Sequence, residues 1–344
     1  MSFIHLTGRV GTRPHRGVCL AVIGIESSAH TFGVGISDNG KILANSKMMY
    51  KITDKGMIPS KVADFHTKNS GRVIRSALES AGLSMRDIDA ISYTKGPGIG
   101  ACLRIGQIAA RSLSVAYNLP ILPVNHALAH LEITRHISGA KDPIGLYVSG
   151  GNSQILGIID EPYKHYHVYG ETFDIGVGNM LDVFARAAKL KPAWGSTVAK
   201  TALGGRYIHM PYTVKGMDFT FTGLLTNAIR LLDTESVKDI AFSMQDTAFA
   251  MLAEATERVL LLTKRRDLIL CGGVAQSDRL RYILNEMCGV HRIHFHAAPN
   301  EYNADNGAMI ALVGEKMFLS GERGGLAGAS TEQHYRVDGV RISW

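Results

Sequence analysis

Residues 18–49 read VCLAVIGIESSAHTFGVGISDNGKILANSKMM, and this stretch decides the fold class. The run VCLAVIGI at 18–25 is apolar and rich in strand-forming residues, and a polar turn begins directly after it at Glu26. The segment 31–49 has the pattern of a β-hairpin, because the tripeptide DNG in its middle favours a tight turn. We therefore predict three consecutive strands at the start of an α/β fold.

The same order of elements occurs twice along the chain. After the first strands we predict a helix around 70–81, a strand at 89–94 and a helix ending near Asn118. The second half repeats this order, with strand-like runs at 143–151, 153–160, 165–170, 267–273 and 292–296, and with helices from about Asp278 and Ala304. This repetition predicts two related α/β lobes around a cleft. We divide the chain into an N-terminal extension (1–17), lobe I (18–125) and lobe II (126–344), which carries the histidine-pair helix and the inserted helices at the cleft.

Composition and net charge indicate which partners and which cellular compartment to expect. The 344 residues are 46% hydrophobic and carry a formal net charge of +7, which suits either a nucleic-acid partner or a generally basic surface. We find no apolar run of the roughly 18 residues that a membrane span needs, so no membrane partner is expected. The four cysteines are far apart and never form CxxC, which predicts reduced thiols in a cytoplasmic protein.

Three strand ends carry glycine turns, namely TKGPGIG (94–100), SGGN (149–152) and CGGVA (271–275). Without a Cβ, such a turn can point main-chain N–H groups at an anion, although each is equally consistent with a plain β-to-α turn. None has the spacing of a Walker A or dinucleotide motif. A nucleotide lying between the last two turns is the sharper hypothesis. The helix between them carries Asp182, either as a nucleotide contact or as a solvated carboxylate paired with Arg186.

The segment PVNHALAH (123–130) places His126 and His130 four residues apart on one helical face. With 14 histidines in the chain, chance alone predicts about 0.6 such pairs, so spacing leaves both a metal site and two ordinary helix histidines open. The pair follows a strand-like run, where sites of α/β sheets gather. Ala127 stands where a zinc protease has glutamate, so proteolysis is excluded. His136 lies off this face and is taken as an ordinary helix residue.

Several stretches together resemble the universal tRNA threonylcarbamoyladenosine transferase family, in the form of the archaeal and eukaryotic catalytic subunit of the KEOPS complex. In order they are IGIESSAHTFGVGI, TKGPGIGACLRIG, VNHALAH, LYVSGGNSQ, GETFDIGVGNMLDVFAR, CGGVA, NADNGAMIA and VDGVRISW. The resemblance runs from about residue 18 to the end of the chain. It implies a duplicated actin-like, sugar-kinase-like ATPase fold with two related lobes around a nucleotide cleft.

The resemblance also implies an activity. Such a protein transfers the threonylcarbamoyl group from threonylcarbamoyl-adenylate to N6 of the adenosine just 3′ of the anticodon in tRNAs that read ANN codons, and AMP leaves. ATP, ADP or AMP would occupy the same cleft. The implied partners are tRNA and the other KEOPS subunits, which include a small protein kinase and small accessory subunits.

The resemblance implies one iron or zinc ion held by His126, His130 and Asp305, with Tyr147 as a further ligand. Two histidines and one carboxylate leave open positions, as a catalytic metal requires. The implied substrate and nucleotide contacts are Tyr147, Val148, Ser149, Gly150, Gly151, Asp182, Gly195 and Ser277. Glu26, at the first strand turn, is expected either to face the cleft and orient an attacking group or to be a plain turn residue.

Two positions depart from the family pattern. Ala199 replaces an acidic residue, and Ser277 replaces an asparagine. Both positions touch the nucleotide in relatives, so we expect weaker binding in the ribose region. The alternative function is an ATPase-like or kinase-like nucleotide-binding scaffold. Glu26 in place of the usual first-strand aspartate, and a histidine pair that such kinases do not need, argue against an active kinase.

Overall fold

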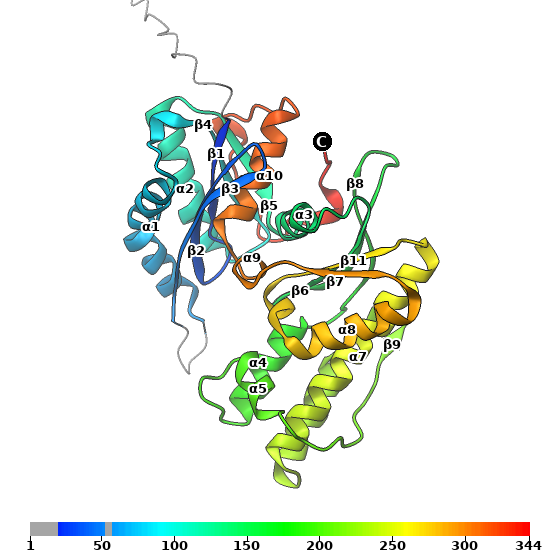
Figure 1. The fold of residues 1–344 in the computed structure, drawn as a ribbon. Coiled ribbons are helices and arrows are strands. Elements are labelled where there is room, and N and C mark those ends of the chain that lie inside the picture. The colour runs from blue at the N-terminus through cyan, green and yellow to red at the C-terminus, as the bar shows by residue number, and fades with distance from the viewer. Residues whose placement is uncertain (1–19, 52–56) are drawn as a thin grey trace, which may run out of the picture.

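The computed structural model describes residues 20–51 and 57–344, and these form two α/β lobes joined through crossing helices (Figure 1). The predicted N-terminal extension, 1–17, lies outside the described residues. The division between the lobes at residue 125 stays a prediction, because helices are exchanged between the lobes at that point.

Lobe I is built on a five-stranded sheet in the order β3-β2-β1-β4-β5. Its strands are β1 (Ala21–Glu26), β2 (Thr31–Asp38), β3 (Lys41–Met49), β4 (Ile88–Gly96) and β5 (Ile121–Asn125). The first three are antiparallel, with β2 and β3 forming the predicted hairpin, while β4 and β5 run parallel to β1. Positive φ angles of 50° and 77° at Asn39 and Gly40 close the predicted hairpin. The helices α1 (Pro59–Ala81) and α2 (Gly100–Tyr117) lie together beside this sheet.

Lobe II repeats this topology. Its sheet has the order β12-β11-β6-β7-β8, which is the order of lobe I read from the other edge. Its strands are β6 (Ile144–Val148), β7 (Ser153–Ile159), β8 (His165–Glu171), β11 (Asp267–Cys271) and β12 (His294–Ala297). Pairing again changes from antiparallel, in β6-β7-β8, to parallel, in β6-β11-β12. The two related lobes predicted from the repeated pattern are therefore confirmed.

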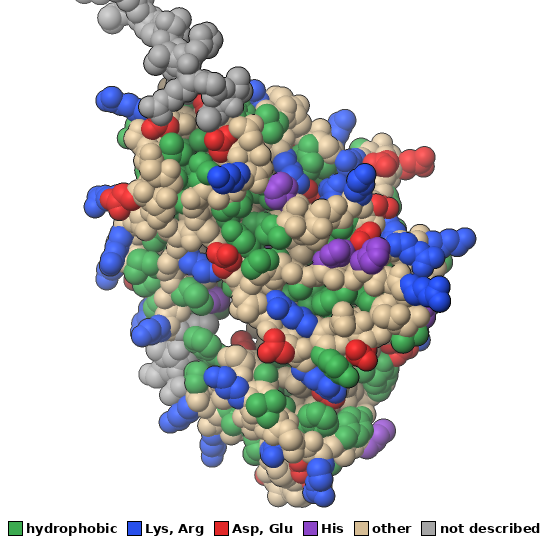
Figure 2. Space-filling view, in the orientation of Figure 1, with side chains coloured by type: hydrophobic (Ala, Val, Ile, Leu, Met, Phe, Trp, Pro, Cys, Tyr) green, Lys and Arg blue, Asp and Glu red, His purple; other side chains and the backbone are tan. Residues whose placement is uncertain are grey.

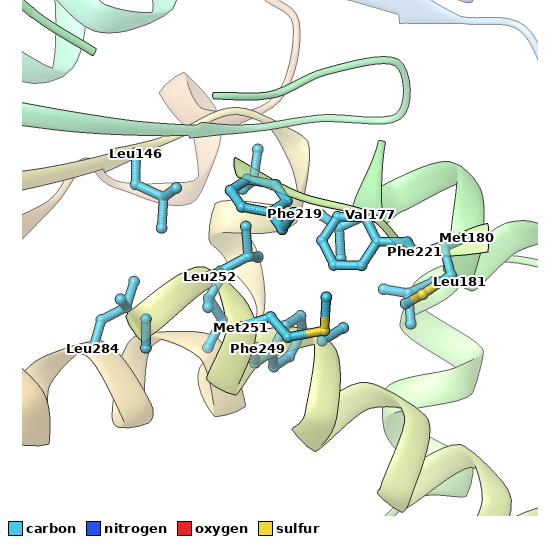
Figure 3. Close-up of a cluster of buried hydrophobic side chains, with 14 of the residues drawn as sticks. Leu146, Val177, Met180, Leu181, Phe219, Phe221, Phe249, Met251, Leu252 and Leu284 are labelled. Carbon is cyan, nitrogen blue, oxygen red and sulfur yellow. The ribbon is translucent and has the colours of Figure 1, made fainter. Parts of the chain in front are cut away.

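Lobe II also carries the segments inserted between β8 and β11. These are α4 (Val177–Ala187), α5 (Gly195–Thr201), the short pair β9 (Val214–Lys215) and β10 (Asp218–Phe219), α6 (Thr222–Arg230) and α7 (Val237–Thr263). The helices α8 (Asp278–His291) and α9 (Asn300–Asn303) follow β11 and β12. Leu146, Phe219, Phe249 and Leu284 belong to the cluster of buried side chains that packs these elements onto the sheet (Figure 3).

Two helices cross between the lobes. The helix α3 (His126–Ser138) follows β5 of lobe I but packs against β6, β11 and β12 of lobe II. The helix α10 (Gly307–Leu319) follows the lobe II strands but packs against the lobe I sheet, and it also contacts α3. Figure 1 shows α3 between the two sheets and α10 among the strands of lobe I. Each lobe therefore depends on a helix whose chain comes from the other.

Glycines let α10 lie directly on β1 and β2. A Cβ built on Gly24 would lie 2.1 Å from the Ala311 nitrogen, and one built on Gly35 would lie 2.3 Å from the Ala308 nitrogen. These are backbone atoms of a helix, so they cannot move aside as a flexible side chain would. Only glycine permits this separation of helix and sheet.

Glu132 joins α3 to other parts of the fold from a fully buried position. Its Oε1 accepts hydrogen bonds from Tyr166 Oη at 2.7 Å and Arg135 Nη1 at 2.9 Å. Its Oε2 accepts from Lys316 Nζ of α10 at 2.6 Å and Trp344 Nε1 at 3.2 Å. Burial would raise the pKa of this carboxyl, but Lys316 and Arg135 outweigh burial and lower it to about 2. The carboxylate is thus charged and fully paired.

The predictions about membrane spans and cysteines can be compared with the structure over the described residues. Within residues 20–51 and 57–344, no helix combines the length and the apolar character required to cross a bilayer. The three described cysteines, Cys102, Cys271 and Cys288, are buried free thiols. Burial raises the pKa of each thiol, so each stays protonated.

Replacing Gly24 with alanine tests the close packing of α10. We expect Gly24→Ala to lower the free energy of unfolding by about 1–3 kcal/mol, because the new methyl group must push the helix away from the sheet. Gly71→Ala is the matched control, since a Cβ on this α1 residue meets nothing within 4 Å. Urea unfolding measures both. Equal stability of Gly24→Ala and wild type would contradict the packing described.

Replacing Glu132 with glutamine tests the buried charge network. Loss of the carboxylate leaves Lys316 and Arg135 without their partner, so we expect a cost of about 3–5 kcal/mol at pH 7. The folded pKa lies below the ordinary value of 4.5, so the charge stabilises the fold above pH 4.5 and its contribution is lost as the pH falls toward 2. Urea unfolding between pH 7 and pH 3 should therefore show the wild type losing its advantage over Glu132→Gln. A difference independent of pH would contradict this account.

Candidate active site between the lobes

A cleft of about 1580 Å³ lies between the lobes. Its walls come from the ends of β1 and β4, the starts of α3 and α5, the glycine turn after β6, and the C-terminal segment. Most of the residues singled out from the sequence line it, namely His126, Tyr147, Ser149, Gly150, Gly151, Asp182, Gly195, Ser277 and Asp305. Figure 2 shows Lys and Arg side chains spread over the visible faces of both lobes. The structure thus gathers residues that are far apart in the sequence into one cavity.

The histidine pair and Asp305 meet where two helices begin. His126 is the first residue of α3, and the side chain of Asn125 before it caps the helix by accepting from Leu128 N at 3.0 Å. Asn306 caps α10 in the same way, accepting from Met309 N at 3.0 Å. Asp305 directly precedes this second cap. Capping at both helices therefore fixes the approach of Asp305 to the histidines.

The three side chains have the spacing of metal ligands. Asp305 Oδ1 lies 3.6 Å from His126 Nε2 and 3.4 Å from His130 Nε2. One potential ligand atom from each residue lies within 4.8 Å of the others. Ligands bound tetrahedrally at zinc distances are about 3.3 Å apart, so the two distances from Asp305 are already close to those of a metal site. The rings of the two histidines meet edge to face, with centroids 4.7 Å apart.

Glu26 orients His126 from behind. This carboxylate is fully buried at the end of β1, and its Oε2 accepts from His126 Nδ1 at 2.9 Å and from Thr94 Oγ1 at 2.8 Å. Its Oε1 accepts from the Ser28 N–H at 2.5 Å. The structure therefore places Glu26 behind His126 and not in the cleft wall, so the expectation that it faces the cleft needs correction. When a carboxylate accepts a hydrogen bond from the Nδ1–H of a metal-binding histidine, the other ring nitrogen, Nε2, is left free to bind the ion.

The protonation of this pair follows from its surroundings. Burial would lower the pKa of His126, but the charge and hydrogen bond of Glu26, together with Asp305, raise it to about 9. Burial would raise the pKa of Glu26, but His126 outweighs burial and lowers it. Burial would likewise raise the pKa of Asp305, and His130 and His126 lower it. The carboxylates are therefore charged, and a cation bound between these residues would replace the proton on His126 Nε2.

His130 tests whether the residues fit a metal. It is 1% exposed, its Nδ1 has no hydrogen-bond partner among the described residues, and its Nε2 faces Asp305 Oδ1 at 3.4 Å. Burial lowers its pKa, so the ring is neutral and able to coordinate. Buried polar atoms are rarely left without a partner. A metal ion bound to Nε2 would give the buried His130 ring such a partner. The Tyr147 ring lies beside His130 with centroids 5.5 Å apart. The donor set therefore fits a cation such as zinc or ferrous iron.

The turn after β6 is held open toward the cleft. The Ser149 N–H donates to Asn152 O at 2.8 Å, and the N–H groups of Gly178 and Asn179 in α4 donate to Ser149 O and Gly150 O at 3.1 and 3.2 Å. A Cβ on Gly151 would meet nothing within 4 Å. The protein itself therefore leaves space above this glycine for a ligand. Val148, by contrast, is fully buried in the lobe II core, so its side chain does not line the cleft.

On the lobe II side of the cleft, some polar groups already form hydrogen bonds within the protein. Asp182 Oδ1 accepts from the Gly195 N–H at 2.7 Å, and the charge of Arg186 on the same helix also acts on its carboxyl group. Burial raises the pKa of Asp182. Ser277 caps α8 by accepting from Leu280 N at 3.4 Å, and Ala199 lines the cleft with a methyl group. Ala199 offers no hydrogen bond here, whereas the Ser277 hydroxyl keeps one donor and one acceptor position beyond its helix cap.

The cleft lining also includes residues that were not predicted from the sequence, among them four whose side chains can bind a ligand. They are His30, Trp194, Arg279 and Tyr335. The position of His30 could have indicated a site, because it follows the turn after β1. Ligands of α/β folds bind beyond the carboxyl ends of such strands. Arg279 is engaged by Asp246 through contacts of 2.9 and 2.5 Å, and Tyr335 belongs to a C-terminal segment without regular structure.

Comparison with known proteins identifies relatives over nearly the whole chain. A family model described as tRNA N6-adenosine threonylcarbamoyltransferase (TsaD) matches residues 40–312. A protein of that name from Thermococcus gammatolerans is 43% identical over 94% of this chain and 100% of its own length. A probable bifunctional tRNA threonylcarbamoyladenosine biosynthesis protein from Methanothermobacter thermautotrophicus is 44% identical over 94% of this chain and 60% of its own length.

Solved structures share the fold at low sequence identity. HypF from T. kodakarensis superposes with a TM-score of 0.56 and 15% identity, over 88% of this chain and 48% of that one. Component A of the (R)-2-hydroxyglutaryl-CoA dehydratase of Acidaminococcus fermentans gives a TM-score of 0.52 and 16% identity, over 86% of this chain and 98% of that one. These likenesses confirm the predicted duplicated actin-like fold, and they carry no argument about activity.

Metal content tests the site directly. We expect one equivalent of transition metal in the wild type and loss of most of it in His130→Ala, which removes a ligand. Glu26→Gln keeps all three ligands but loses the charge behind His126, so its metal affinity should fall about 10- to 100-fold. Mass spectrometry of the metal after dialysis against a chelator measures both. Full metal content in His130→Ala would contradict the assigned ligands.

Proposed function

Because the chain belongs to the tRNA N6-adenosine threonylcarbamoyltransferase family, we propose that its cleft transfers a threonylcarbamoyl group from threonylcarbamoyl-adenylate to N6 of the adenosine just 3′ of the anticodon. AMP is the leaving group. The observation that carries the proposal is the meeting of His126, His130 and Asp305 beside an open glycine turn in one cleft. Nothing at this site requires a phosphoryl transfer to a sugar or protein.

Family membership confirms the resemblance inferred from the sequence motifs, and with it the assignment of the chain as a transferase of tRNA modification. The alternative, an ATPase-like scaffold without transfer activity, has less support. A scaffold needs a nucleotide pocket, but it does not need a buried, neutral histidine whose Nε2 faces a charged aspartate beside a second histidine.

We assign the ion, iron or zinc, to His126, His130 and Asp305, with Tyr147 as a further ligand. When bound there, such an ion supplies Lewis acidity toward a carbonyl or phosphate oxygen. Glu26 is a positioning residue that holds the tautomer and orientation of His126 through the 2.9 Å contact to Nδ1. Burial of both groups keeps water away from this contact and preserves the ligand geometry.

The glycine turn holds the adenylate in this proposal. The segment Tyr147–Gly151 contacts it, and the open main chain at Gly150 and Gly151 offers N–H groups to the phosphate or to the negative charge that develops as the amine attacks. Asp182 and Gly195 form the next part of the wall, already linked by their own hydrogen bond. Ser277 contributes through the start of α8. With Ala199 apolar and Ser277 shared with the cap of α8, we expect weak contacts to the ribose.

The partners follow from the family. The names of the relatives connect this family with tRNA, and we propose that tRNA is the acceptor here. We also propose that the other KEOPS subunits, including the small protein kinase and the accessory subunits, assemble with this chain in the cytoplasm. The net charge of +7 suits a polyanionic partner.

Transfer from threonylcarbamoyl-adenylate to unmodified tRNA tests the proposal, with the partner subunits present. His126→Ala should lower the rate about 100-fold or more, because a ligand and its link to Glu26 are both lost. His136→Ala is the matched control on the same helix, since its Nε2 bonds to Gly40 O at 2.8 Å and it is not among the described residues that line the cleft. Transfer that survives His126→Ala unchanged would remove the metal site from the reaction, and absence of transfer by the wild type would contradict the function.

A further inference from the structure

The C-terminal segment 331–336 forms part of the cleft wall on the lobe I side. Glu332 N–H donates to Lys95 O at 2.8 Å, and the Gly98 N–H donates to Gln333 O at 3.2 Å. Asn125 Nδ2 donates to Tyr335 O at 2.9 Å. The segment therefore runs across the ends of β4 and β5, and Tyr335 is held by the residue that directly precedes His126.

The aromatic side chains that line the cleft are unevenly divided. Tyr147, Trp194, Phe242 and Phe249 belong to lobe II, where the proposed function places the adenylate. Among the described residues lining the opposite wall, Tyr335 alone is a Phe, Tyr or Trp. On this wall of the cleft, Tyr335 is therefore the ring that an acceptor base can stack on.

The surroundings of Tyr335 suit a flat, uncharged partner. Lys95 Nζ lies 4.3 Å from the ring centroid, so a cation covers one face and fixes the ring, while the ring borders the cleft. Close packing also fixes the Tyr335 Cβ, which a Cβ on Gly96 would approach to 3.2 Å. A rigid aromatic ring in a cleft is the usual partner of an unstacked nucleic-acid base.

A smaller hollow of about 510 Å³ adjoins the cleft on this side. It is lined by Gly100, Arg104, Thr331, Glu332, Gln333 and His334, and the last two also line the cleft. Arg104 is exposed and forms no ion pair with any described residue. A guanidinium in this position can contact the phosphate next to a base that lies on Tyr335.

We propose that Tyr335 is the platform on which the target adenine of the RNA stacks, and that Arg104 contacts the adjacent backbone phosphate. The inference rests on the proposed function, because it assigns the acceptor side of the same site. Tyr335 is thus a binding residue for the acceptor, with no part in holding the adenylate. The hydrogen bond from Asn125 to Tyr335 O connects this platform to the start of α3, which carries the two histidines.

Binding of an RNA hairpin tests the proposal without requiring turnover. Two probes are used, namely an unmodified anticodon stem-loop of an ANN-reading tRNA and the same hairpin with an abasic site at the target position. Tyr335→Leu keeps apolar bulk but loses the aromatic face, and should weaken binding of the intact hairpin roughly 5- to 150-fold while leaving the abasic hairpin unchanged. Tyr335→Phe should bind like the wild type. Tyr163→Ala, at an outer loop beyond the cleft lining, is the control.

Arg104→Ala should weaken both hairpins equally, since a phosphate contact does not depend on the base. Equal losses for the two hairpins in Tyr335→Leu, or no loss in either, would overturn the stacking assignment. A wild type that does not prefer the intact hairpin would overturn it as well. In the transfer assay Tyr335→Leu should raise KM for tRNA and leave KM for the adenylate unchanged. A higher KM for the adenylate with an unchanged KM for tRNA would overturn the proposal, because Tyr335 would then bind the donor. A wild type that binds the hairpin through Tyr335 but never transfers would contradict the proposed function alone.

Discussion

The backbone of α10 lies against β1 and β2 with no side chain between them, because Gly24 and Gly35 face Ala311 and Ala308. This contact holds α10 against the face of the lobe I sheet. Asp305, just before the start of α10, is thereby carried from the lobe II chain to a position facing α3. The candidate metal site exists because two helices are exchanged between the lobes, and the glycines are what make the exchange close enough.

Two buried carboxylates hold α3 in its place between the lobes. Glu26 binds the first residue of the helix from lobe I, and Glu132 ties its middle to α10, β8 and the C-terminal residue. A buried charge costs several kcal/mol unless it is fully paired, and both are paired. The histidines therefore sit on a helix that can neither slide nor rotate without breaking one of these networks. A site placed this rigidly suits chemistry in which ligand orientation matters.

The sequence predicted the strands and the duplication because hydrophobic runs and turn residues are local signals, as at 18–49 and 143–160. The spacing of His126 and His130, and their place after a strand, made a metal site possible but left two ordinary helix histidines open as well. These signals could not join the pair to Asp305, since that meeting depends on α10 crossing to lobe I, and only the family resemblance supplied the third ligand. The orientation of Glu26 and the burial of Val148 depend on packing in three dimensions. Tyr335 escaped notice because irregular segments have no periodicity to read.

Anomalous diffraction from crystals of the purified protein, recorded at the iron and zinc absorption edges, tests the central claim most directly. The account predicts one strong peak between His126, His130 and Asp305, about 2.0–2.3 Å from an atom of each. A protein that carries its metal elsewhere, or that shows no peak at these residues when active, would contradict it.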